Sequence, residues 1–100
     1  MAKYALVVGI SKYRDASISD LPYASRDAEG MGACLEADCE FEDVKVLKSR
    51  KGTNRVSSSD IGYELARIAD AIGPDDTFVF YFAGHGVRSG GQSRLLTSDD

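Results

Sequence analysis

The N-terminal third of the chain changes from a continuous apolar run to a helical pattern. Residues 4–10 read Tyr-Ala-Leu-Val-Val-Gly-Ile, which is typical of a strand buried on both faces. Residues 11–22 are polar and rich in turn formers, so they predict a loop. Apolar residues then recur every three or four positions and predict a helix from about Ser25, with Ser25 as its N-cap.

The pattern repeats in the remainder of the chain. Within residues 43–48, Val44, Val46 and Lys48 alternate with Lys45 and Leu47, and this period of two predicts a second strand. Residues 57–60 resemble a capping box, and isoleucine and leucine recur at helical spacing over residues 61–72 before Gly-Pro. The most apolar run, residues 77–82, predicts a central strand. A glycine-rich turn follows, and residues 94–97 predict a short final strand, such as a hairpin arm.

The order β-α-β-α-β predicts an α/β fold with a mostly parallel sheet and flanking helices joined by right-handed crossovers. One hundred residues are enough for one such domain and not for two. In parallel sheets of this kind, ligands and catalytic groups lie at the carboxyl ends of the strands. His85 lies at that position, three residues beyond Phe82.

Composition and charge narrow the functional classes. Hydrophobic residues make up 43% of the chain and charged residues 28%, which is ordinary for a soluble globular protein. The net charge of −4 argues against nucleic-acid binding through a basic surface. The apolar run near the N-terminus is too short for a signal sequence or a membrane span, so we expect a cytoplasmic protein without membrane contact.

His85, the single histidine, is the first candidate for chemistry. An isolated histidine is more often structural or simply exposed than catalytic. Here, however, glycines flank it on both sides, and we expect them to allow unusual backbone dihedrals and the close approach of another group. Histidine is also the usual general base near neutral pH.

Four segments together resemble the caspase-like cysteine peptidases, especially the metacaspases and bacterial caspase homologues. They are the N-terminal strand with its Gly-Ile-Ser-Lys-Tyr continuation, residues 21–28, residues 78–87 around Gly-His-Gly, and residues 95–99. The resemblance implies a partial three-layer caspase-like fold over residues 1–100. It also implies that a cysteine thiolate attacks the substrate carbonyl, that His85 transfers the proton, and that the Gly86 N–H helps to form the oxyanion hole.

The resemblance also implies a substrate pocket. Asp27 matches a metacaspase position that lines the pocket for P1, the residue before the scissile bond, which favours Arg or Lys there. Arg26 offers the alternative of an acidic P1 residue. An aspartate in the first helical turn also stabilises the helix dipole, by about 0.3–1 kcal/mol, without any substrate. Ala83 stands where some metacaspases have a polar pocket residue.

The nucleophile is the missing component. The cysteine of caspases follows the histidine by about 50 residues, whereas no cysteine follows His85 here. Cys34 and Cys39 precede it and are expected to be reduced, non-catalytic thiols. We therefore expect a protein or peptide substrate for a parent enzyme and an inactive isolated chain. A missing C-terminal part or a second chain would supply the thiol, unless the protein is a naturally short, non-catalytic relative.

Other classes receive less support. A non-catalytic interaction module on the same fold is the main alternative. Nucleotide binding lacks its glycine motifs, and a serine hydrolase using Ser89 or Ser93 lacks a nucleophile elbow. We expect no cofactor or metal: some metacaspases need calcium, but Asp75-Asp76 and Asp99-Asp100 lack the spacing of a calcium loop.

Overall fold

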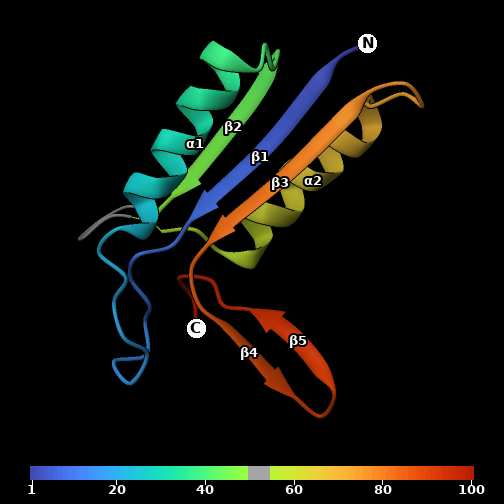
Figure 1. The fold of residues 1–100 in the computed structure, drawn as a ribbon. Coiled ribbons are helices and arrows are strands. Elements are labelled where there is room, and N and C mark those ends of the chain that lie inside the picture. Colours follow the sequence, from blue (N-terminus) through green and yellow to red (C-terminus); the bar gives the residue numbers. More distant parts are fainter. Residues whose placement is uncertain (50–54) are drawn as a thin grey trace.

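A parallel sheet of three strands forms the centre of the fold. The structure is a computed structural model that describes residues 1–49 and 55–100. Strand β1 (Lys3–Gly9) lies between β2 (Asp43–Lys48) and β3 (Thr77–Ala83), and both neighbours run parallel to it. Figure 1 shows the three arrows pointing in the same direction.

The carboxyl ends of the three strands reach one edge of the sheet together, because Gly9 pairs with Lys48 on one side and with Ala83 on the other. The prediction that residues 77–82 form the central strand is wrong for the described chain: β1 is central and β3 is at an edge. A continuous apolar run indicates that both faces of a strand are covered, and it does not indicate whether a strand lies on each side.

Two helices cover opposite faces of this sheet, α1 (Ala24–Asp38) and α2 (Ser58–Ala71). Alternate side chains of β1 enter two separate cores, as expected for the period of two along a strand. Ala5 and Val7 pack with Ala28 and Leu35 of α1, whereas Leu6, Val8 and Ile10 pack with Val56 and Ile68 on the α2 side. The three layers confirm the predicted α/β class. In the described part of the chain, no helix is long and apolar enough to cross a membrane.

The two helices begin differently. Ser57 caps α2 as predicted: its hydroxyl accepts a hydrogen bond from the Asp60 N–H at 3.2 Å, and the Asp60 carboxylate accepts one from the Ser57 N–H at 2.9 Å. The prediction of Ser25 as the N-cap of α1 is wrong, because the N-cap is Tyr23, two residues earlier, and Ser25 lies in the first turn of the helix. The Ser25 hydroxyl instead donates to the carbonyl oxygen of Ser49, at the end of β2.

A hairpin projects beyond the carboxyl edge of the sheet (Figure 1). It joins β4 (Gly86–Ser89) to β5 (Gln92–Leu95) in antiparallel pairing. Gly90 and Gly91 have φ values of 57° and 78°, the positive values that a two-residue type I′ turn requires. The expected hairpin arm therefore exists but ends at Leu95, two residues earlier than predicted.

Candidate active site

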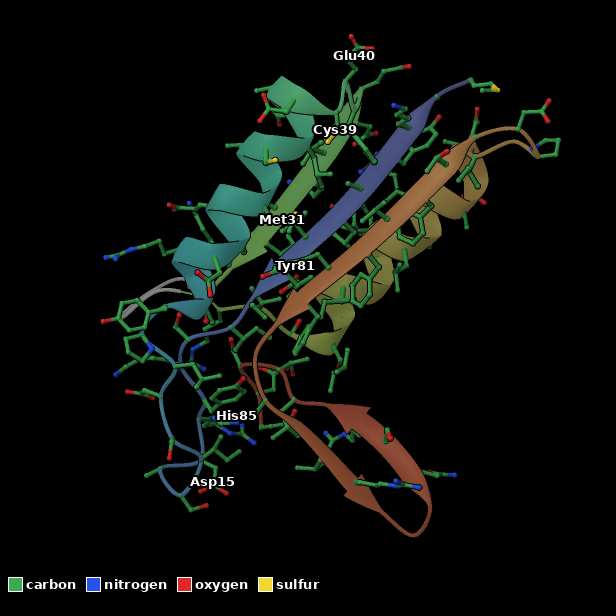
Figure 2. All side chains as sticks on the ribbon, viewed as in Figure 1. Asp15, Met31, Cys39, Glu40, Tyr81 and His85 are labelled. Carbon is green, nitrogen blue, oxygen red and sulfur yellow. The ribbon has the colours of Figure 1, made fainter. Side chains whose placement is uncertain are left out.

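The candidate residues come from three segments that meet at the carboxyl edge of the sheet. His85 lies between β3 and β4, and Asp27 lies in the first turn of α1. The loop over residues 11–22 runs along the same edge, where Figure 2 shows His85 beside it. Backbone hydrogen bonds tie this loop to the C-terminal segment: the Arg14 N–H donates to the Ser98 carbonyl at 3.1 Å, and the Asp15 N–H donates to that of Asp100 at 2.9 Å.

The imidazole of His85 is oriented by this loop. Its Nε2 atom lies 2.8 Å from the carbonyl oxygen of Ser19. Because a carbonyl oxygen only accepts hydrogen bonds, Nε2 carries a hydrogen and donates it. In the neutral ring, Nδ1 is then the nitrogen that can accept a proton. The geometry therefore selects the tautomer in which Nδ1 can act as a base.

Tyr13 supports His85 from the other side. Its hydroxyl accepts a hydrogen bond from the His85 N–H at 2.8 Å and donates one to the Ile10 carbonyl oxygen at 3.4 Å. The two rings are also in contact, with centroids 5.3 Å apart and planes at 52°. Burial raises the pKa of the Tyr13 phenol, against the lowering effect of the His85 N–H, so the hydroxyl remains neutral and can serve both partners.

The glycines on either side of His85 have different roles. Neither has positive φ, so the expectation of unusual dihedrals at these two positions is wrong. The expected close approach is found at Gly84, where an added Cβ would lie 2.9 Å from the Tyr13 hydroxyl and 2.9 Å from the ring of Phe82. At Gly86, by contrast, the nearest atom to an added Cβ would be the Arg94 carbonyl oxygen, at 3.5 Å.

The pairing of the hairpin fixes the direction of the Gly86 N–H. The Leu96 N–H donates to the His85 carbonyl at 3.0 Å, which makes this a hydrogen-bonded position of the ladder. Hydrogen-bonded and non-bonded pairs alternate along an antiparallel ladder. Gly86, which pairs with Leu95, is therefore at a non-bonded position, and its N–H points away from β5.

Asp27 borders a hollow that ends next to His85. The hollow has a volume of about 200 Å³. Its lining combines the loop before α1, the first turn of α1 and the end of β3: Leu21, Pro22, Tyr23, Ala24, Asp27, Ala83 and Gly84. Among the described residues of this lining, Asp27 is the only charged one, and no described basic side chain forms an ion pair with it. Arg26 does not line the hollow, since its guanidinium lies over the Tyr23 ring, 5.5 Å from the centroid.

Neither cysteine approaches His85. Cys39 caps the C-terminal end of α1, and Figure 2 shows it at the opposite end of the sheet from His85. Cys34 is 10 residues beyond the start of α1, which corresponds to about 15 Å along the helix. Desolvation and then the Asp38 carboxylate raise the pKa of the Cys34 thiol, so the reactive thiolate is disfavoured.

The second aspartate of each acidic pair, Asp76 and Asp100, binds nearby backbone N–H groups. The carboxylate of Asp76 accepts hydrogen bonds from the N–H groups of Gly73 and Ala2, at 2.8 and 2.7 Å. That of Asp100 accepts one from the Thr97 N–H at 2.8 Å and pairs with Arg94 at 2.5 Å. These N–H donors lower the pKa of both carboxyl groups. In the part of the chain that the structure describes, no three potential metal ligands lie together.

Sequence reasoning missed the two groups that hold His85. The Ser19 carbonyl is a backbone atom in a polar loop, and side-chain patterns carry no information about it. Tyr13 had a weak signal, since it follows the first strand by four residues and a large aromatic residue in a polar loop usually packs against a neighbour. Of the alternative serines, Ser93 pairs with Arg88 within the hairpin, and the side chain of Ser89 lies outside what the structure describes.

The model of the caspase domain, Peptidase_C14, matches residues 2–100 of the chain. No curated protein matches the chain.

Proposed function

The chain belongs to the caspase domain family of peptidases, and from that premise we propose that it is the histidine-bearing part of a cysteine endopeptidase that cleaves after a basic residue. His85 is the acid/base, the Gly86 N–H is an oxyanion donor, and Asp27 binds the P1 side chain. Each role is argued below from the contacts of the residue concerned.

The orientation of His85 is the observation that carries the proposal. Because Nε2 donates to the Ser19 carbonyl, Nδ1 remains available as a proton acceptor. In a cysteine peptidase this nitrogen takes the thiol proton and later gives it to the leaving amine. The Tyr13 hydroxyl fixes the backbone of His85 as well, so both the ring and its attachment point are held before substrate arrives.

Gly86 supports the next step. When the thiolate attacks, negative charge develops on the carbonyl oxygen of the substrate, and a backbone N–H directed at this oxygen lowers the barrier. The Gly86 N–H points out of the hairpin and adjoins His85 in the chain, which suits this role. Such a donor contributes about 3 kcal/mol to transition-state stabilisation.

The lining of the Asp27 hollow favours a basic P1 side chain. The aliphatic stem of Arg or Lys can lie against Leu21 and Pro22 while its charged head reaches the Asp27 carboxylate. An acidic side chain would meet that carboxylate without a cation in the lining to offset it. Arg26, the alternative specificity residue, is turned onto Tyr23 and lies outside the hollow.

The thiol must come from outside these 100 residues, because Cys39 and Cys34 are at the other end of α1. In the part of the chain that the structure describes, β3 has a strand on one side only, and its other edge offers a place for the segment that carries the thiol. Phe78 and Phe80 on β3 are 38% and 40% exposed, unusual values for aromatic residues in a sheet. A further strand from the same protein or from a second chain would cover them. The isolated chain is accordingly inactive.

The unpaired edge of β3 also supports the second candidate function, that of a non-catalytic interaction module. A partner strand added to β3 would bury these aromatic residues without any chemistry at His85. The two candidates differ in what they require of His85, since only the peptidase needs its ring.

The test is peptide cleavage by the longer gene product, using substrates with Arg, Lys or Asp at P1. Asp27→Asn should reduce kcat/KM for the Arg and Lys peptides by about 10- to 100-fold, the value of a hydrogen bond to a charged group. Asp70→Asn is the matched control, because Asp70 is exposed on α2, away from the hollow.

His85→Ala separates the two candidates. It should abolish cleavage while leaving the fold unchanged. Cleavage that survives His85→Ala would exclude His85 as the acid/base, and a longer protein that binds partners but cleaves no peptide would favour the interaction module.

A further inference from the structure

We propose that the β4–β5 hairpin binds the leaving-group side of the peptide, and that Arg88 selects acidic residues there. This inference rests on the proposed peptidase function and concerns a second hollow, which is distinct from the one at Asp27. It assigns a binding role to a hairpin that lies outside the three-stranded sheet.

The second hollow adjoins the candidate oxyanion donor. It has a volume of about 310 Å³ and is lined by both strands of the hairpin: Gly86, Val87, Arg88, Ser93, Arg94 and Leu95. Gly86 thus lines the hollow and also directs its N–H away from β5. A carbonyl group bound to this N–H would lie at the rim of the hollow.

The two hollows lie on either side of His85 along the chain. The Asp27 hollow ends at Gly84 and the hairpin hollow begins at Gly86. A peptide with its P1 side chain beside Asp27 and its scissile carbonyl at Gly86 must continue past His85. The proton from His85 goes to the leaving amine, so the segment after the scissile bond has to be next to this ring. The hairpin hollow adjoins Gly86 and so offers a surface for this segment.

The charge of the hairpin hollow determines its ligand. Arg88 and Arg94 are the charged residues among those described in its lining, which include no acidic side chain. Arg94 already pairs with Asp100 at 2.5 Å. Arg88 is exposed and forms no ion pair with any residue that the structure describes. A carboxylate of the peptide would therefore pair with Arg88 without displacing an existing partner.

Two further features make the hairpin a suitable docking surface. Leu95, which lies on the same face of the hairpin as Arg88, is 47% exposed, so the hollow offers apolar surface as well as charge. The type I′ turn at one end and the bond between the Leu96 N–H and the His85 carbonyl at the other hold the hairpin in a defined shape. A surface ordered in advance loses less entropy when it binds a peptide. The predicted ligand is a peptide with acidic and apolar residues just after the scissile bond.

Binding can be measured separately from cleavage in the longer gene product carrying His85→Ala. Fluorescence anisotropy would compare three peptides with Arg at P1 and Glu, Gln or Lys at the two positions after the scissile bond. We expect the Glu peptide to bind about two- to fivefold more tightly than the Gln peptide, as for one exposed ion pair, and the difference to shrink in high salt. Arg88→Glu should reverse the order of the Glu and Lys peptides, and Arg88→Lys should retain it.

Lys45→Glu is the matched control, because Lys45 is exposed on β2 and the substitution changes the net charge equally. Equal binding of the three peptides, or equal effects of Arg88→Glu and Lys45→Glu, would overturn the inference. Cleavage that depends on His85 but shows no preference for the residues after the scissile bond would also overturn it and leave the proposed function intact. If the His85→Ala protein prefers the Glu peptide but the protein with His85 intact cleaves no peptide, the result would support the hairpin site and refute the peptidase.

Discussion

Gly84→Ala tests how tightly the backbone around His85 is packed. The added Cβ would lie 2.9 Å from the Tyr13 hydroxyl oxygen and 2.9 Å from the Phe82 ring. Cβ atoms are not found this close to other heavy atoms, so at least one neighbour must move. The phenol is the neighbour that matters for the site, because it accepts the hydrogen bond from the His85 N–H.

The expected effect is a loss of about 1–3 kcal/mol in the free energy of unfolding. Overpacking costs about 1–3 kcal/mol, and a lost hydrogen bond about 1 kcal/mol. Replacing glycine by alanine also raises the free energy of unfolding by about 0.4–1 kcal/mol, because it restricts the unfolded chain. Gly86→Ala is the matched control: its Cβ would have no neighbour closer than 3.5 Å, so stability should stay the same or rise.

Urea unfolding of the single variants and of Gly84→Ala/Tyr13→Phe measures this directly. Tyr13→Phe removes the oxygen that the new Cβ would meet, so the double variant should lose less stability than the sum of the two single variants, by about 0.5 kcal/mol or more. Equal effects of Gly84→Ala and Gly86→Ala, or strict additivity in the cycle, would refute the packing described for this loop.

Two further predictions concern stability away from the site. Ser57→Ala should lower the free energy of unfolding by about 1 kcal/mol, because the capping box with Asp60 is lost; no change would show that the cap is dispensable. Arg67→Met should lower it by about 2 kcal/mol, because the guanidinium loses its charged hydrogen bonds to Asp43 and to the buried Glu64. The hydrogen bonds from Arg67 lower the pKa of Asp43, so this stabilisation is present above the unfolded pKa of about 3.9 and is lost as pH falls through the folded value. Stability measured from pH 6 to pH 2 should therefore depend less on pH in Arg67→Met, and an unchanged pH dependence would contradict this origin.

The order of elements followed from hydrophobic periodicity, because burial on the faces of strands and helices leaves a direct trace in the sequence. The strand predicted over residues 4–10 formed one residue earlier, at Lys3–Gly9, and the capping box at Ser57 formed as predicted. The place of β3 at an edge did not follow, since apolar residues on a strand do not report its neighbours. Phe78 and Phe80 are of a residue type that is usually buried, but they are partly exposed.

At the candidate site, glycine spacing and position drew attention to His85, but not to the contacts that orient it. Its hydrogen bonds to the Ser19 carbonyl and the Tyr13 hydroxyl join positions 66 and 72 residues apart. Contacts of this range arise from the tertiary fold and leave no local pattern. The misassigned cap at Ser25 has the same cause, because its hydroxyl bonds to the distant Ser49 carbonyl and not to its own helix.

The central claim is that His85 presents Nδ1 as the proton acceptor because Nε2 donates to the Ser19 carbonyl. Nitrogen-15 NMR of the imidazole in this chain, at a pH where the ring is neutral, tests it directly. We predict that the ring hydrogen is on Nε2 and that Nδ1 has the chemical shift of an unprotonated nitrogen. A hydrogen on Nδ1, or rapid averaging of the two tautomers, would contradict the claim.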